Sequence, residues 1–95
     1  MNYTFIDNIT PAGESSPFNT KDFTCMTLFG SVAGASTLTI QYSADGRKFY
    51  DSGDKIVMAG AGEFGQFFDL RADWIRIKAS GAVATTAIGA FGPAA

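Results

Sequence analysis

The side chains that most often carry out chemistry in proteins are scarce in this sequence. Its 95 residues include no histidine, so the commonest general base and the usual partner of a catalytic serine or cysteine are missing. Paired carboxylates could still perform acid–base catalysis, but the only glutamates, Glu14 and Glu63, fall in or beside expected loops. The aspartates fall near expected turns, where their side chains bond to the nearby backbone. We therefore expect no enzymatic activity and no cofactor.

Metal ligands and reactive thiols are the next candidates for chemistry. Asp45, Asp51 and Asp54 could converge at one end of a β-sandwich, and carboxylate oxygens suit calcium. Calcium needs roughly six to eight oxygen ligands, and the spaced loop that would supply them is missing, so turn formation explains these residues better. Cys25 is the single cysteine and lies in an apolar run, which favours a buried, unreactive thiol and excludes an intramolecular disulfide. We expect no metal site.

Charge gives little guidance to a partner. Seven basic and nine acidic residues are scattered without runs, for a net charge of −2. The nearest approach to a basic stripe is Arg71, Arg76 and Lys78, which a solvent-facing strand explains better than a nucleic-acid interface. No apolar run approaches the roughly 18 residues of a membrane span, and the first residues do not resemble a signal peptide. The sequence predicts a soluble protein without a nucleic-acid or membrane partner.

The elements that must position these residues are short β-strands. Residues 38–43 alternate apolar and polar side chains, which is typical of a half-buried strand, and Asp45-Gly46 then supplies a hairpin turn. Strands are predicted at residues 3–6, 23–29, 37–43, 48–50, 56–58, 63–70, 74–79 and 85–91. Strands at this spacing predict an all-β protein with little or no helix. We expect one domain, residues 1–95, folded as an antiparallel β-sandwich of Greek-key or jelly-roll type.

Residues 1–18 leave two alternatives open. Tyr3, Phe5 and Phe18 could anchor an extended N-terminal arm on a neighbouring protein, because added strands dock through main-chain hydrogen bonds and a few apolar side chains. The stretch could equally be the first edge strand of the sandwich, followed by a loop at residues 10–17.

Phe67 and Trp74 are out of phase with the expected core faces of their strands. Phe64 and Phe68 share one face of the first strand, so Phe67 lies on the other, and Trp74 is likewise opposite to Ile75. Exposed rings on a small β-domain indicate a protein-docking patch or a platform on which sugars stack. A register read wrongly by one residue would instead place both rings in the core.

Two stretches resemble small structural proteins of tailed phages, of the capsid decoration (cement) and head-fibre type. They are residues 38–53, LTIQYSADGRKFYDSG, and residues 68–81, FDLRADWIRIKASG. In those proteins, a hairpin with the pattern QYS-DG and an aromatic–aspartate pair precedes a strand pair with F-D-L and aromatic-I-R-I-K motifs. The resemblance covers residues 37–81, and Phe49-Tyr50 stands here in place of tryptophan.

The resemblance implies a virion structural protein on the outer capsid surface of a phage, made in the host cytoplasm. Such proteins commonly sit as trimers at local three-fold positions and clamp neighbouring capsid subunits. We therefore expect a homotrimer whose partner is the major capsid protein. Phe67 and Trp74 are the first candidates for contact residues, followed by Tyr3, Phe5 and Phe18. The alternative is a carbohydrate- or receptor-binding module of a phage tail or fibre.

Overall fold

The computed structural model describes residues 1–10 and 13–93, which form strands and their connections without a helix. The strands are β1 (Asn2–Ile9), β2 (Phe18–Asn19), β3 (Phe23–Val32), β4 (Ser36–Ser43), β5 (Tyr50–Met58), β6 (Gly62–Asp69), β7 (Trp74–Ala79) and β8 (Thr85–Pro93). Within those residues there is accordingly no helix that could cross a membrane. The predicted all-β fold is confirmed.

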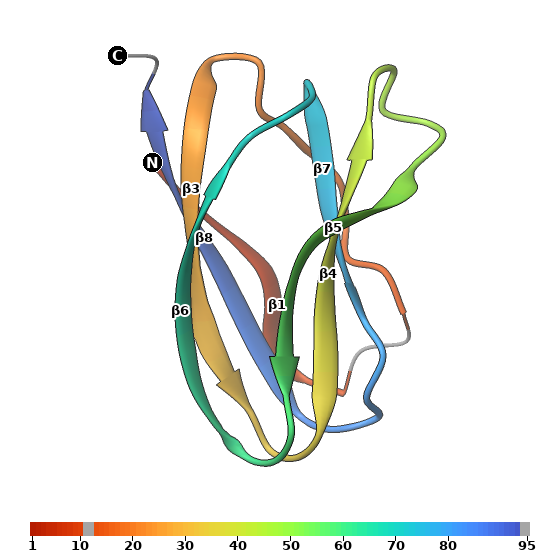
Figure 1. Cartoon of the computed structure of the whole chain (residues 1–95), viewed down its shortest axis with the longest axis vertical. Coiled ribbons are helices and arrows are strands. Elements are labelled where there is room, and N and C mark those ends of the chain that lie inside the picture. Colours follow the sequence, from red (N-terminus) through yellow and green to blue (C-terminus); the bar gives the residue numbers. More distant parts are fainter. Residues whose placement is uncertain (11–12, 94–95) are drawn as a thin grey trace.

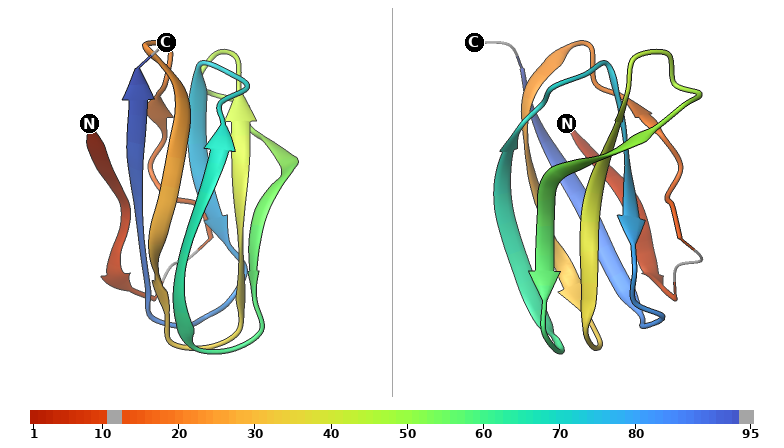
Figure 2. Two further views of the ribbon diagram at one scale, coloured as in Figure 1. Left: turned by 60° about the vertical axis from the view of Figure 1, so that its left-hand side comes forward. Right: turned by 45° about the vertical axis from the view of Figure 1, so that its right-hand side comes forward.

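The eight strands form two antiparallel sheets that pack face to face (Figure 1). Sheet A has the order β1-β8-β3-β6, and sheet B has the order β2-β7-β4-β5. Strand β1 thus pairs with β8, β2 with β7, β3 with β6 and β4 with β5, which is the connectivity of a jelly roll. In the left-hand view of Figure 2, the strands of sheet A lie side by side. The expected sandwich is confirmed, and its strand order is that of a jelly roll.

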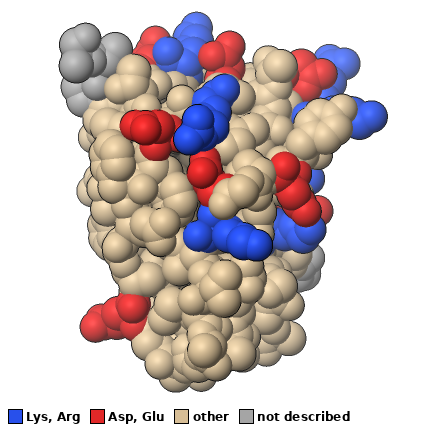
Figure 3. Space-filling view, viewed as in Figure 1, with Lys and Arg blue, Asp and Glu red and all other residues tan. Residues whose placement is uncertain are grey.

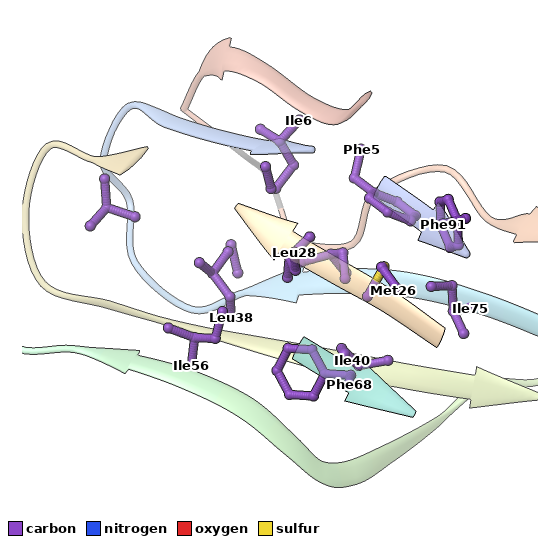
Figure 4. Close-up of a cluster of buried hydrophobic side chains, with 14 residues drawn as sticks. Phe5, Ile6, Met26, Leu28, Leu38, Ile40, Ile56, Phe68, Ile75 and Phe91 are labelled. Atoms are coloured by element: carbon purple, nitrogen blue, oxygen red, sulfur yellow. The ribbon is translucent and has the colours of Figure 1, made fainter. Parts of the chain in front are cut away.

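Alternating side chains from both sheets fill the space between them (Figure 4). Met26 and Leu28 of β3 are fully buried against Ile75 and Ile77 of sheet B. The rest of the core comprises Phe5, Ile6, Val32, Leu38, Ile40, Ile56, Phe68, Ala79, Ala87 and Phe91. Strand β3 lies between β8 and β6 in the interior of sheet A, with Met26, Leu28 and Val32 facing the core.

Strand β5 differs from its prediction. The expected strands at residues 48–50 and 56–58 are joined into one element, whose pairing with β4 shifts register after Thr39. At this irregularity the Ser52 hydroxyl donates a hydrogen bond to the carbonyl of Ile40 at 2.6 Å. A side chain therefore satisfies a backbone group that the regular ladder would have paired, and the strand continues through the bulge.

The N-terminal stretch follows the second of its two alternatives. Strand β1 pairs with β8 as an edge strand of sheet A. Within the expected loop at residues 10–17, the backbone N–H of Ser15 donates to the carbonyl of Ile77 at 2.8 Å, which places this segment along β7. Residues 11–12 of that loop lie outside the described part of the chain. In this single chain, residues 2–9 therefore belong to the sandwich itself.

Candidate interaction surfaces

Charged side chains on the outer face of sheet B pair with one another. The Gln41 amide donates to the Asp51 carboxylate (Nε2 to Oδ1, 2.7 Å) and accepts from the Arg76 guanidinium (Nε to Oε1, 2.6 Å). Arg76 also lies 3.6 Å from Glu14, and the Lys78 ammonium lies 3.3 Å from Asp51. The hydrogen bonds from Gln41 and Lys78 lower the pKa of the Asp51 carboxyl. These groups satisfy one another and already hold the segment around Glu14 against the sheet.

Trp74 also lies on the outer face of sheet B, as its position opposite the buried Ile75 predicts. The ring is half-buried because the connection between β4 and β5 lies over it. A Cβ atom on Gly46 would be 2.9 Å from the ring carbon Cε2, and Gly46 has a φ of 77°, which glycine adopts without strain. Trp74 is therefore outside the core but largely covered by the chain's own turn.

The three aspartates considered as calcium ligands have separate structural roles. Asp45 accepts two backbone hydrogen bonds within its own turn, at 2.9 and 3.1 Å, and these lower the pKa of its carboxyl. Asp51 belongs to the sheet B network, and Asp54 accepts hydrogen bonds from the Tyr42 hydroxyl (2.8 Å) and the Arg71 guanidinium (3.3 Å). Burial and then the bond to Asp54 raise the pKa of Tyr42, so its hydroxyl stays protonated.

No group of three or more His, Cys, Asp or Glu side chains within residues 1–10 and 13–93 is arranged to hold a metal ion. The same residues enclose no pocket.

Aromatic side chains from the N-terminal stretch close one side of the sandwich. The Phe18 ring lies between Tyr3 and Phe91, at centroid distances of 4.5 and 4.7 Å. Phe5 packs edge-on against Tyr3 at 4.9 Å, and Phe23 lies 5.4 Å from Phe91. Phe5 is buried in the core, while Tyr3 and Phe18 are partly buried against it. Packing within the fold explains all three predicted rings, and a role for them in partner contact stays a prediction.

Phe67 is exposed, as the sequence predicts. It projects from the outer face of sheet A, is 60% exposed and lies directly across from Thr27 of β3. In the next row of the sheet, Phe29 of β3 pairs with Ile88 of β8, and Ala90 lies beside Thr27. We call the surface formed by Thr27, Phe29, Phe67, Ile88 and Ala90 the Phe67 face. They form an uncharged surface that crosses three strands.

The surroundings of the Phe67 face carry acidic groups and no basic ones within the sheet. The four strands of sheet A contain no Lys or Arg, whereas Glu63 and Asp69 lie on the edge strand β6. Cys25 is directly across from Asp69 and is half-buried. The expectation of a buried thiol is therefore wrong, because Cys25 is out of phase with the buried Met26 and so lies half-buried on the outer face of β3.

The two ends of the sandwich differ in charge. One end includes the connections at residues 33–35 (Ala-Gly-Ala), 59–61 (Ala-Gly-Ala) and 80–84 (Ser-Gly-Ala-Val-Ala). The connection that follows β1 also begins there, since Ile9 pairs with Thr85, but its residues 11–12 lie outside the described part of the chain. The opposite end is formed by the connections at residues 20–22, 44–49 and 70–73, each of which includes charged residues. On the face shown in Figure 3, most charged side chains lie over the upper and middle parts of the molecule, and one acidic side chain lies low on the left. We call the three uncharged connections the loop tip.

Sequence reasoning identified Phe67 but missed Phe29, Ile88 and the loop tip. Phe29 and Ile88 come from strands far apart in the sequence, and only the order β8-β3-β6 brings them beside Phe67. The repeated Ala-Gly-Ala at residues 33–35 and 59–61 was the available signal for the tip. The repeat alone does not show that its two copies lie together, because that depends on which end of the sandwich each connection reaches.

Comparison of the chain with models of protein families, with curated proteins and with solved structures finds no match.

Proposed function

We propose that this chain is a non-enzymatic structural protein of a phage virion, a capsid decoration (cement) protein of the outer head surface. It acts as a homotrimer that binds the major capsid protein and strengthens the shell. The observation that carries the proposal is the Phe67 face, an uncharged surface with an exposed ring that the chain's own core does not use. The sequence motifs at residues 38–53 and 68–81 support the same class of protein.

The Phe67 face is suited to packing between copies of the chain. A phenylalanine ring that is 60% exposed leaves on the order of 100 Å² to be buried, which is worth roughly 2–3 kcal/mol. Phe29 and Ile88 extend the apolar area next to it. We assign this face to the contacts within the trimer.

A jelly-roll scaffold fits a structural role in a virion. The fold recurs in viral capsid and lectin domains, and fold alone does not decide between them. Strengthening of the shell follows from avidity: each copy makes a modest contact, and a linked trimer on a repeating lattice multiplies it. Opening a joint between capsid subunits would then also require breaking a trimer.

The alternative is a carbohydrate- or receptor-binding module of a phage tail or fibre. Phe67 favours it to the extent that an exposed ring can stack on a sugar. Trp74, the other expected stacking residue, lies beneath the turn that contains Gly46. Only one of the two expected stacking rings is therefore open to a sugar.

The test compares two aromatic residues with the same exposed fraction on opposite sheets. Phe67→Ser should convert the trimer into a monomer in light scattering, and it should weaken binding to phage heads that lack this protein by about tenfold or more, since avidity is lost. Tyr50, also 60% exposed but at one end of β5 in sheet B, is the control, and Tyr50→Ser should leave both properties unchanged. Wild-type protein that ignores the heads and instead binds glycans on an array would overturn the proposal in favour of the alternative.

A further inference from the structure

We infer that Asp45-Gly46 is a site of spontaneous aspartate isomerisation, and that the Ser43 hydroxyl keeps it unreacted while the chain is folded. This inference concerns the chemical lifetime of the turn between β4 and β5, and it does not depend on the proposed function. It is carried by the residue pair itself, by the hydrogen bonds of Ser43 and by the packing of the turn on Trp74.

The residue pair has the chemistry that this reaction needs. The Gly46 nitrogen attacks Cγ of Asp45, the new N–C bond closes a succinimide ring, and the carboxyl O–H leaves with the amide proton as water. A second water opens the ring at either carbonyl, which gives aspartate again or isoaspartate, whose backbone runs through Cγ. Glycine favours the attack because it has no side chain and its backbone is the most flexible. Asp45 is the only aspartate or asparagine that a glycine follows in this sequence.

In the folded chain one hydroxyl engages both reacting groups. Ser43 Oγ donates to Asp45 Oδ1 at 3.0 Å and accepts the backbone N–H of Gly46 at 2.9 Å. The backbone N–H groups of Arg47 and Lys48 donate to the same carboxylate oxygen, at 2.9 and 3.1 Å. The attacking nitrogen and the carboxyl group are therefore each held by another partner, and the ring can close only after these hydrogen bonds break.

The same contacts keep the carboxyl group in its less reactive form. Water leaves from a protonated carboxyl, because a carboxylate oxygen is a poor leaving group. The hydrogen bonds from Arg47, Lys48 and then Ser43 lower the pKa of Asp45, so the protonated form is rarer than in the unfolded chain. Ser43 is itself fixed, since it is 2% exposed and lies directly across from Trp74 in the pairing of β4 with β7.

Isomerisation would disturb the cover of the Trp74 ring. The reaction adds one carbon to the backbone before Gly46 and displaces the carboxylate that accepts the hydrogen bonds of the turn. Gly46 lies so close to the ring that a Cβ atom there would be 2.9 Å from Cε2. A longer backbone cannot keep both this contact and the hydrogen bonds, so the ring should become more exposed. Trp74 is the only tryptophan, and its fluorescence therefore reports on this turn alone.

The experiment follows the formation of isoaspartate at position 45 by peptide mapping, during long incubation at neutral pH. Wild-type protein is incubated folded and in urea, and folded Ser43→Ala is compared with folded Ser36→Ala. Ser36 is the matched control, because it is also a buried serine of β4 whose hydroxyl accepts the N–H of a glycine, Gly81, at 3.0 Å. Unfolding midpoints identify any variant that fails to fold.

Unfolded wild type and Ser43→Ala should each form isoaspartate about fivefold faster or more than folded wild type, the factor that one net hydrogen bond contributes. Ser36→Ala should react at the wild-type rate. The isoaspartate form of the folded protein should show Trp74 emission at longer wavelength than the unreacted form. Amide hydrogen exchange on the wild-type protein gives a test that needs no variant: the Gly46 N–H should exchange more slowly than in the unfolded chain.

Several results would overturn the inference. Equal rates in folded and unfolded wild type, or an unprotected Gly46 amide, would show that the fold does not hold the pair unreacted. A Ser43→Ala rate equal to that of wild type, or an equal rise in Ser36→Ala, would remove the role of the Ser43 hydroxyl. Unchanged Trp74 emission in the isoaspartate form would show that the reaction does not move the turn.

Discussion

At the scale of single residues, the turn after β4 shows how local chemistry shapes a surface. Asp45 fixes the turn by accepting hydrogen bonds from the backbone N–H groups of Arg47 and Lys48, and Gly46 provides the positive φ. The turn can then lie against Trp74, because glycine has no Cβ to collide with the ring. A residue that the sequence presents as an exposed platform is covered for this reason.

Asp45 gives the first prediction, on the dependence of stability on pH. Its carboxyl has a lower pKa in the folded chain than the ordinary value of 3.8, because it accepts hydrogen bonds as an anion. The stability that it contributes is therefore present above pH 3.8 and is lost as the pH falls through the folded pKa. Asp45→Asn should remove this part of the acid-induced loss, measured by urea unfolding between about pH 5 and pH 2.

The control for Asp45 is Asp7→Asn, a change on β1 far from this turn. Part of the pH dependence should remain in Asp45→Asn, because the pKa of Asp51 is also lowered in the folded chain. An acid dependence identical to that of the wild type in Asp45→Asn would contradict the role assigned to this carboxylate.

At the scale of elements, the alternation of apolar and polar side chains predicted which segments form strands and which of their side chains face the core. The alternation in residues 74–79 gave β7 with Ile75 and Ile77 inward, and the apolar residues on both faces of 23–29 gave the interior strand β3. The sequence pattern predicted two strands where β5 is a single one, because the bulge at Ser52 interrupts the alternation of side chains. Strand order could not be predicted from periodicity, since it depends on pairings between distant segments.

Close approach between β3 and β8 gives a prediction at the element scale. A Cβ atom on Gly30 would collide with the backbone carbonyl of Thr86, and backbone cannot move aside as a side chain can. Gly30→Ala should therefore destabilise the protein by about 3 kcal/mol, measured by chemical denaturation. Gly65 on β6 is the matched control: its Cβ would lie 3.9 Å from that of Phe29, an ordinary contact.

Gly65→Ala should change the free energy of unfolding by less than about 1 kcal/mol, and a small gain is expected from reduced freedom of the unfolded chain. Equal effects of the Gly30 and Gly65 substitutions would show that the tight contact between β3 and β8 does not constrain position 30.

At the scale of the whole molecule, the proposed function rests on how charged and apolar side chains are distributed over the surface. Sheet B carries a network of paired charges around Gln41, sheet A presents the Phe67 face, and the loop tip is uncharged. Phe67 could be predicted from the sequence because its exposure is set by the phase of one strand. The tip could not be predicted, because three separate connections create it only once the jelly roll is closed.

The central claim is that this chain works as a trimer on a phage head. The most direct measurement is the solution mass of the wild-type protein by light scattering, alone and after mixing with phage heads that lack it. The account predicts a particle of three times the 10.0 kDa chain mass that co-sediments saturably with the heads. A 10.0 kDa monomer that remains in the supernatant at every head concentration would contradict it.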